Sequence, residues 1–88
     1  MEVNRFISRA TELIGQDIAI FERYARGHRA KIGPWEVERL QCEGTRRASE
    51  LQNLIIDTTH KAEANERRAA ELRAFLDEAG LAPGPATT

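Results

Sequence analysis

The chain has 88 residues, a formal net charge of −1 and a single cysteine. It is long enough for one domain at most, its charge gives no general attraction to nucleic acid or to an anionic membrane, and one cysteine excludes an internal disulfide. The longest strongly apolar run, residues 54–56, is too short to span a bilayer, so we expect a cytoplasmic protein without a disulfide framework.

The first predicted element is a helix over residues 3–32. Its apolar residues recur at spacings of three and four, which is typical of an amphipathic helix with a wide apolar face. They are Val3, Phe6, Ile7, Ala10, Leu13, Ile14, Ile18, Phe21, Tyr24 and Ala25. Asp17 lies close to this face, where a buried carboxylate would need a partner. Gly27 is an alternative end for the helix, and residues 28–33 would then form a loop.

Gly33 and Pro34 predict the turn of a hairpin. Proline cannot continue a helix that has already begun, but its fixed backbone suits the first position of a new one. Glu36 then falls in the first turn, where it complements the helix dipole. We therefore predict a second helix over residues 34–79.

The second helix carries a heptad pattern, in which alternating spacings of four and three predict a seam along one side. The seam residues are Val37, Gln41, Gly44, Ala48, Leu51, Ile55, Thr58, Ala62, Asn65, Ala69, Leu72, Leu76 and Ala79. Gly44 with Thr45, and the β-branched run of residues 55–59, are two places where the helix could break. Gly80 is expected to end it, with Leu81 touching Leu76, and residues 82–88 are expected to form a disordered tail.

These elements predict an all-α fold, an antiparallel two-helix hairpin in one domain of residues 1–81. With a turn at Gly33, the end of the longer second helix would overhang and expose an apolar stripe. The simplest cover for that stripe is a second copy, which would complete a four-helix bundle; a different protein is the alternative. The predicted assembly interface comprises Leu51, Ile55, Ala62, Asn65, Ala69, Leu72, Phe75 and Leu76.

One short segment resembles a known active-site element. Arg23 and His28 are separated by four residues, and this spacing is similar to the Arg-x4–6-His element of the HEPN ribonucleases, which are all-α and often dimeric. The resemblance covers six residues and implies that the arginine would polarise a phosphate while the histidine moves a proton. Tyr24 departs from the family pattern, in which a polar residue usually follows the arginine.

A carboxylate and an imidazole also stand one helical turn apart, at Asp57 and His60, with Glu63 following. Such pairs ligate di-metal centres inside helical bundles. Here Thr58 lies on the seam, which directs His60 toward solvent. We therefore predict no metal, no cofactor and no small-molecule substrate.

The stretch between Glu22 and Glu36 contains basic residues and no acid. Its predicted partner-binding residues are Arg26, Arg29, Lys31 and Trp35, placed at the hinge of the predicted hairpin. Basic residues beside aromatics bind acidic protein surfaces or RNA. The sequence favours a non-enzymatic adaptor, assembly factor or inhibitor, of a size seen in phage-type regulators, which binds itself and another protein. RNA binding is the alternative, and a ribonuclease is the third hypothesis.

Overall fold

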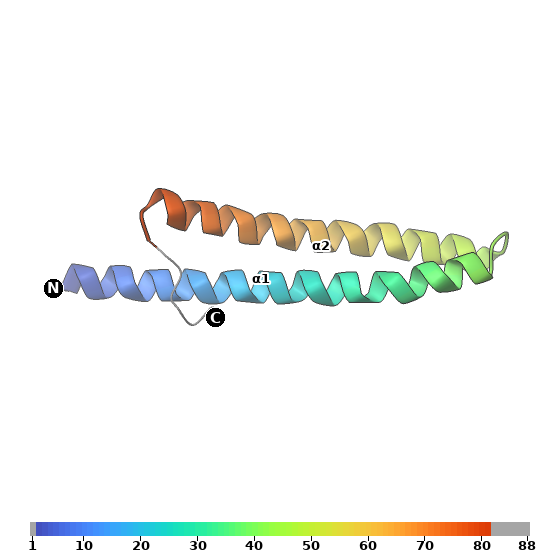
Figure 1. Ribbon diagram of the computed structural model, residues 1–88, viewed down its shortest axis with the longest axis horizontal. Coiled ribbons are helices and arrows are strands. Elements are labelled where there is room, and N and C mark those ends of the chain that lie inside the picture. Colours follow the sequence, from blue (N-terminus) through green and yellow to red (C-terminus); the bar gives the residue numbers. More distant parts are fainter. Residues whose placement is uncertain (1, 82–88) are drawn as a thin grey trace.

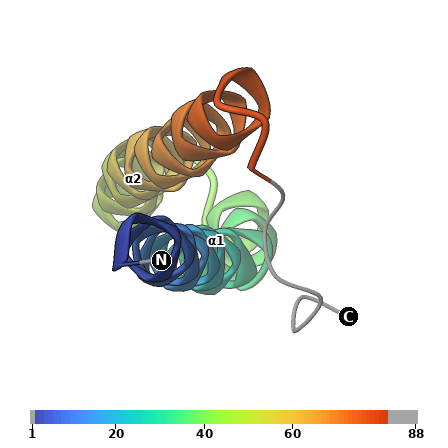
Figure 2. The same cartoon turned by 90° about the vertical axis from the view of Figure 1, so that its left-hand side faces the viewer.

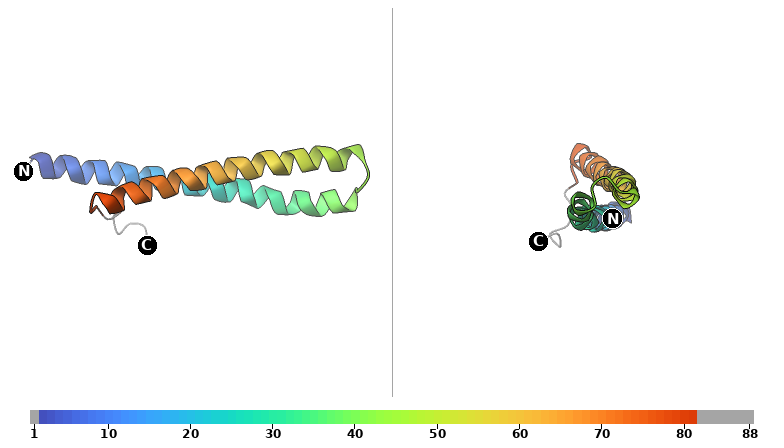
Figure 3. Two further views of the ribbon diagram at one scale, coloured as in Figure 1. Left: turned by 90° about the horizontal axis from the view of Figure 1, so that it is seen from above. Right: turned by 90° about the vertical axis from the view of Figure 1, so that its right-hand side faces the viewer.

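A computed structural model describes residues 2–81 as two antiparallel helices, which confirms the predicted all-α hairpin. Helix α1 spans Glu2–Gln41 and helix α2 spans Arg46–Glu78 (Figure 1). Seen from the end that holds the N-terminus, the molecule is two helices side by side (Figure 2). From above, the helices cross at a shallow angle (Figure 3), as expected for side chains that repeat every seven residues.

The predicted turn at Gly33 and Pro34 is wrong, because Pro34 lies inside α1. Proline costs a helix one hydrogen bond and bends it, and α1 does bend toward α2 over its last turns (Figure 1). The cost of keeping Pro34 inside the helix is offset by the burial of a residue farther along the chain. Leu51, near the start of α2, is completely buried, and only the part of α1 beyond Gly33 can cover it. Packing thus outweighs the local preference for a break.

The turn lies instead at residues 42–45, one of the two weak points of the predicted second helix. Gly44 has a φ of 84°, a left-handed conformation that glycine adopts without the penalty of a Cβ atom. Thr45 caps α2, since its hydroxyl oxygen accepts a hydrogen bond from the Ala48 amide at 3.2 Å. A left-handed glycine followed by a threonine cap is what reverses the chain here.

The predicted seam is confirmed from Ala48 to Leu76, where it faces α1. It is wrong for Val37, Gln41 and Gly44, which lie in α1 or the turn and are exposed, and for Ala79, which is exposed at the other end. Its buried members are Leu51, Thr58, Ala62, Ala69 and Leu76, and the residues between them on the seam are half-buried. We call the matching line, which runs along α1 and ends at the first residue of the turn, the inner seam. It consists of Ile14, Ile18, Phe21, Ala25, His28, Ile32, Trp35, Arg39 and Cys42. Its spacing also alternates between four and three, so both helices contribute one continuous line to the core.

The C-terminal end of α2 is confirmed as predicted. Gly80 has a φ of 72°, its amide donates to the Asp77 carbonyl at 3.1 Å, and the Leu81 amide donates to the Leu76 carbonyl at 2.8 Å. These two bonds define a Schellman motif. Leu81 packs on the cluster that contains Leu76. The tail predicted for residues 82–88 lies outside the described residues.

The predicted overhang of the second helix is wrong because its cause, the turn at Gly33, is wrong. Leu76 is fully buried and Leu72 is half-buried, and both belong to one hydrophobic cluster with Ile14, Ile18 and Phe21 of α1. The overhang belongs to α1, whose first turns extend past the end of α2 (Figure 1). All side chains from Val3 to Arg9 are exposed.

Candidate functional site

The N-terminal half of α1 carries a second line of residues, which we call the outer seam. It consists of Val3, Phe6, Ala10, Leu13, Asp17, Ile20 and Tyr24. Its last four members, Leu13, Asp17, Ile20 and Tyr24, each directly precede an inner-seam residue, so the outer seam lies about 100° around α1 from the line that packs on α2. Apart from half-buried Ala10, its members are exposed, and the exposed fraction is 74% for Phe6 and 44% for Leu13. The apolar side chains of the outer seam are therefore mostly not covered by α2.

One flank of the hairpin is charged. Glu22 accepts hydrogen bonds from Arg73 with a shortest nitrogen–oxygen distance of 2.8 Å, and Glu66 accepts from both Nε and Nη2 of Arg29, the latter at 2.7 Å. The hydrogen bonds from Arg29 hold the pKa of Glu66 below its ordinary value, and the same bonds raise the pKa of Arg29. Paired guanidinium and carboxylate groups thus bridge α1 and α2 along this flank.

The opposite flank carries a groove with a mixed lining of Phe21, Ala64, Asn65, Arg67, Arg68 and Glu71. Phe21 lies there beside Arg68 of α2, since both residues line one shallow groove. Phe75 follows Arg68 by seven residues and therefore points to the same side of α2. Phe75 is 54% exposed although its neighbour Leu76 is buried. The outer seam lies on this side of α1, so the outer seam and Phe75 together form what we call the apolar face of the hairpin.

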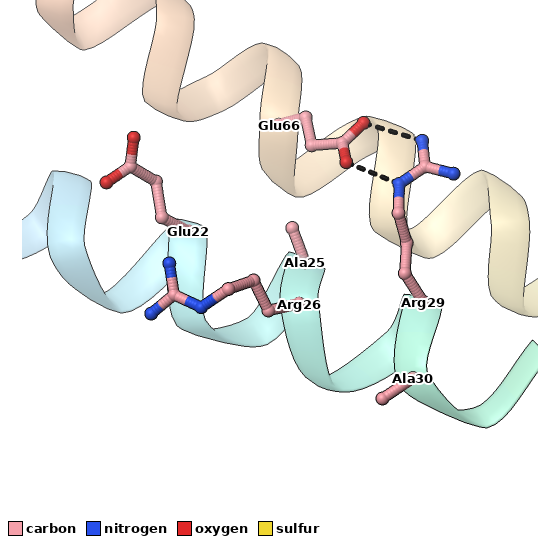
Figure 4. A pocket seen from close by; sticks show the side chains of 6 residues that line it. All are labelled: Glu22, Ala25, Arg26, Arg29, Ala30 and Glu66. Atoms are coloured by element: carbon pink, nitrogen blue, oxygen red, sulfur yellow. Dashed lines mark hydrogen bonds and ion pairs between the residues drawn. The ribbon is translucent and has the colours of Figure 1, made fainter.

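A groove on the charged flank contains two of the predicted partner-binding residues, Arg26 and Arg29. It is lined by Glu22, Ala25, Arg26, Arg29, Ala30 and Glu66. Figure 4 shows the two hydrogen bonds from Arg29 to Glu66 across the groove, with Arg26 and Glu22 nearer its other end. Two carboxylates and two guanidinium groups make the lining nearly neutral, so the groove offers no concentrated positive charge.

The predicted basic binding surface does not lie at the hinge. Residues 26–35 occupy the second half of α1, and the turn follows at residues 42–45. Arg29 is paired with Glu66, and Trp35 is half-buried on the inner seam. Arg26 and Lys31 are exposed. The four residues therefore do not form a single exposed patch with Trp35 at its centre.

The hairpin tip holds its own ion pair. Arg47, at the start of α2, donates to Glu38 of α1 at 2.8 Å, and this hydrogen bond holds the pKa of Glu38 below its ordinary value. The first turn of α2 contains no acid and two arginines, an arrangement that the helix dipole disfavours. The pairing of Arg47 offsets part of that cost. Cys42 is half-buried beside this pair, and its thiol donates to the Glu38 carbonyl at 3.1 Å.

The structure does not bring the proposed catalytic groups together. Arg23 and His28 are five residues apart on one continuous helix, so their side chains point about 140° away from each other. Arg23 is exposed, whereas His28 is half-buried on the inner seam. Asp57, His60 and Glu63 are exposed on α2, and no cluster of three potential metal ligands occurs within residues 2–81.

The predicted assembly residues are mostly used inside the hairpin. Leu51, Ala62, Ala69 and Leu76 are buried against α1, and among the eight only Phe75 is an exposed apolar side chain. The outer seam was not predicted from the sequence as a separate surface. Its signal was present, because the residues from Val3 to Tyr24 alternate at spacings of three and four, but it was merged with the inner seam into one wide face.

Comparisons of the chain with protein-family models, with curated proteins and with solved structures gave no match. Neither helix contains, within residues 2–81, a stretch long and apolar enough to cross a membrane. The exposed outer seam and the exposed Phe75 beside it therefore carry the proposed function.

Proposed function

We propose that the chain is a non-enzymatic interaction module that binds protein through the apolar face formed by the outer seam of α1. The exposure of this seam carries the proposal. A surface helix of a monomer normally directs one apolar stripe into its own core and presents polar residues elsewhere. Here α1 has two stripes, and α2 covers one. Contiguous exposed apolar surface of this kind marks sites where proteins meet.

The face has the form that helical partners recognise. Side chains at spacings of three and four along one helix insert between those of a second helix laid against it. Phe6 and Tyr24 are aromatic residues of the kind that contribute most to such interfaces. The adaptor, assembly-factor or inhibitor role expected from the sequence fits this mode of binding, as does a reducing cytoplasmic location for the single thiol.

One exposed cation of α1 would border this interface without forming its centre. Lys31 continues the spacing of the outer seam toward the hairpin tip, whereas Arg26 lies on the charged flank. Charges at the edge of an interface mainly affect the rate and selectivity of association. RNA binding by the same stretch is supported less well, because Glu66 pairs with Arg29 in its middle.

Site-specific photo-cross-linking tests the proposal. The full chain is produced in its native cells with a photoreactive phenylalanine analogue at Leu13, on the outer seam, or at Asn53, on the exposed side of α2. We expect a discrete protein adduct from position 13 and none from position 53. Equal labelling at both positions, or no adduct from position 13, would contradict the proposal.

A further inference from the structure

The outer seam extends for similar lengths on both sides of Leu13. Counted outward from Leu13, its spacings are 3, 4 and 3 toward the N-terminus and 4, 3 and 4 toward the C-terminus, so Ala10 comes level with Asp17, Phe6 with Ile20 and Val3 with Tyr24 to within one residue. A helix that meets a second copy of itself in antiparallel orientation makes these pairings when a two-fold axis lies near the middle residue. Every matched pair except Ala10 with Asp17 then places apolar side chains opposite each other.

Charge selects the antiparallel orientation. In a parallel pair, Asp17 would face Asp17 of the other copy within an apolar seam, where two carboxylates repel each other strongly. In the antiparallel pair, Asp17 faces the small side chain of Ala10 and comes level with Arg9. Arg9 is exposed and pairs only with Glu12 on its own helix, at 3.1 Å, within the described residues. It can therefore turn toward the carboxylate of the other copy.

The exposed apolar area is comparable with one side of a stable dimer. The apolar face includes six large exposed side chains: Val3, Phe6, Leu13, Ile20, Tyr24 and Phe75. At roughly 150–200 Å² for each fully exposed large side chain, they present on the order of 600 Å². A standard interface covers about 800 Å² per partner, and the flanking polar residues would supply the difference.

We propose that the outer seam of α1 binds the outer seam of a second copy in antiparallel orientation, with a two-fold axis near Leu13. The two hairpins then form a four-helix assembly in which the two α1 helices lie at the centre and Phe75 of each α2 borders the contact. The inference rests on the proposed function and names the partner. It differs from a bundle built on the α2 seam, because that seam is already filled by α1.

The solution mass of the full chain tests the inference. Light scattering after size exclusion is expected to give twice the chain mass of 9.9 kDa for the wild type. Leu13→Glu is expected to give the monomer mass with unchanged helix content by circular dichroism. Leu54→Glu is the matched control, since Leu54 has a similar exposure of 40% but lies on α2 toward the hairpin tip; it should remain a dimer. A monomeric wild type, or a dimeric Leu13→Glu variant, would overturn the inference.

Spin-label distances test the orientation in a Cys42→Ser background. An antiparallel pair centred on Leu13 separates labels at position 26 by roughly 35–40 Å along the helix axis, and keeps labels at position 12 close, at 1.5 Å of rise per residue. Similar short distances at both positions would rule out the antiparallel arrangement.

The cross-linking experiment separates this inference from the proposed function. An adduct of twice the chain mass from position 13, together with a dimer in solution, supports both. If the pure chain is a monomer and position 13 links to a different protein, the homodimer is refuted and the interaction module stands. A monomer without any adduct refutes both.

Discussion

At the scale of single residues, two leucines of α2 differ only in where they point. Leu51 is completely buried on the seam, whereas Leu54, one turn later, is 40% exposed. We expect Leu51→Ala to lower the free energy of unfolding by about 2–5 kcal/mol, because it leaves a cavity in the core. Leu54→Ala should cost clearly less. Urea unfolding followed by far-ultraviolet circular dichroism measures both, at one fixed protein concentration.

Equal losses for the two leucine variants would mean that the exposed face of α2 is covered in solution. The position of Leu54 near the hairpin tip, away from the outer seam, makes that outcome inconsistent with the proposed dimer. Comparing Leu51→Ala with Leu54→Ala therefore also tests whether the face of α2 near the hairpin tip stays uncovered in solution.

The ion pairs at Glu38 and Glu66 predict an acid-sensitive contribution to stability. Both carboxylates have pKa values below the ordinary 4.5, because each accepts hydrogen bonds from an arginine of the other helix. A lowered pKa in the folded state gives stability that is fully present above the ordinary value and is lost as the pH falls through the lowered value. The free energy of unfolding should therefore decrease below about pH 4.5.

The Glu38→Gln, Glu66→Gln double variant should show a shallower decrease in the same range, measured by urea unfolding at a series of pH values. Glu71→Gln is the control, because Glu71 has no ion pair within residues 2–81. If the double variant and the control follow the wild-type profile alike, the interhelical pairs contribute nothing measurable. That result is common for exposed pairs and would assign the alignment of the helices to the seam alone.

At the scale of elements, the same substitution is expected to act in opposite directions at two glycines. Gly27 is exposed inside α1 with no atom within 4 Å of an added Cβ, so Gly27→Ala should stabilise the helix by about 0.5–1 kcal/mol. Gly44 adopts a φ of 84° in the turn, where a side chain is strained, so Gly44→Ala should destabilise the hairpin. Thermal unfolding of the two variants gives both signs, and stabilisation by Gly44→Ala would refute the turn.

At Pro34 the sequence predicted a helix boundary, whereas α1 continues through this residue. Proline and the preceding glycine are a strong local signal for a helix boundary, and the boundary was predicted there. The competing term is the burial of Leu51 and its neighbours on α2, which depends on residues that are distant along the chain. By contrast, the seam of α2 and the Schellman end at Gly80 were predicted correctly, because each depends on spacing or chemistry within one helix.

The outer seam illustrates the same limit for the candidate site. Its apolar members other than Ile20 were recognised from their spacing, but whether they belong to the core or to a binding surface depends on the direction from which α2 approaches. That direction is fixed by contacts such as Ile18 with Leu76. Sequence periodicity therefore identified the residues, and the division into two seams required the packed hairpin.

At the scale of the whole molecule, the hairpin is a rod. Its extents are 65 × 20 × 15 Å and its radius of gyration is 18.5 Å, compared with about 12 Å for a compact domain of this length. A rod of two helices buries few side chains completely, and within residues 3–81 these are six apolar residues and Thr58. The thermodynamic stability of a lone hairpin should therefore be modest.

Self-association would couple that stability to concentration. If two copies pair through the outer seam, the midpoint of thermal unfolding should rise as the protein concentration increases, because binding favours the folded state. The Leu13→Glu variant should unfold at one temperature irrespective of concentration. A concentration-independent midpoint for the wild type across a wide range would contradict the dimer.

The charged flank has a consequence for the alignment of the two helices. Along it, an acid on α1 meets a base on α2 at Glu22 and Arg73, and the order is reversed one heptad later at Arg29 and Glu66. Sliding α2 by seven residues in one direction would place Glu22 opposite Glu66, and sliding it in the other would place Arg29 opposite Arg73. The small seam residues Ala62 and Ala69 would tolerate such a slip sterically. The alternation of charge penalises it in both directions, so these exposed pairs would discriminate against misaligned hairpins even where they add little to the stability of the correct one.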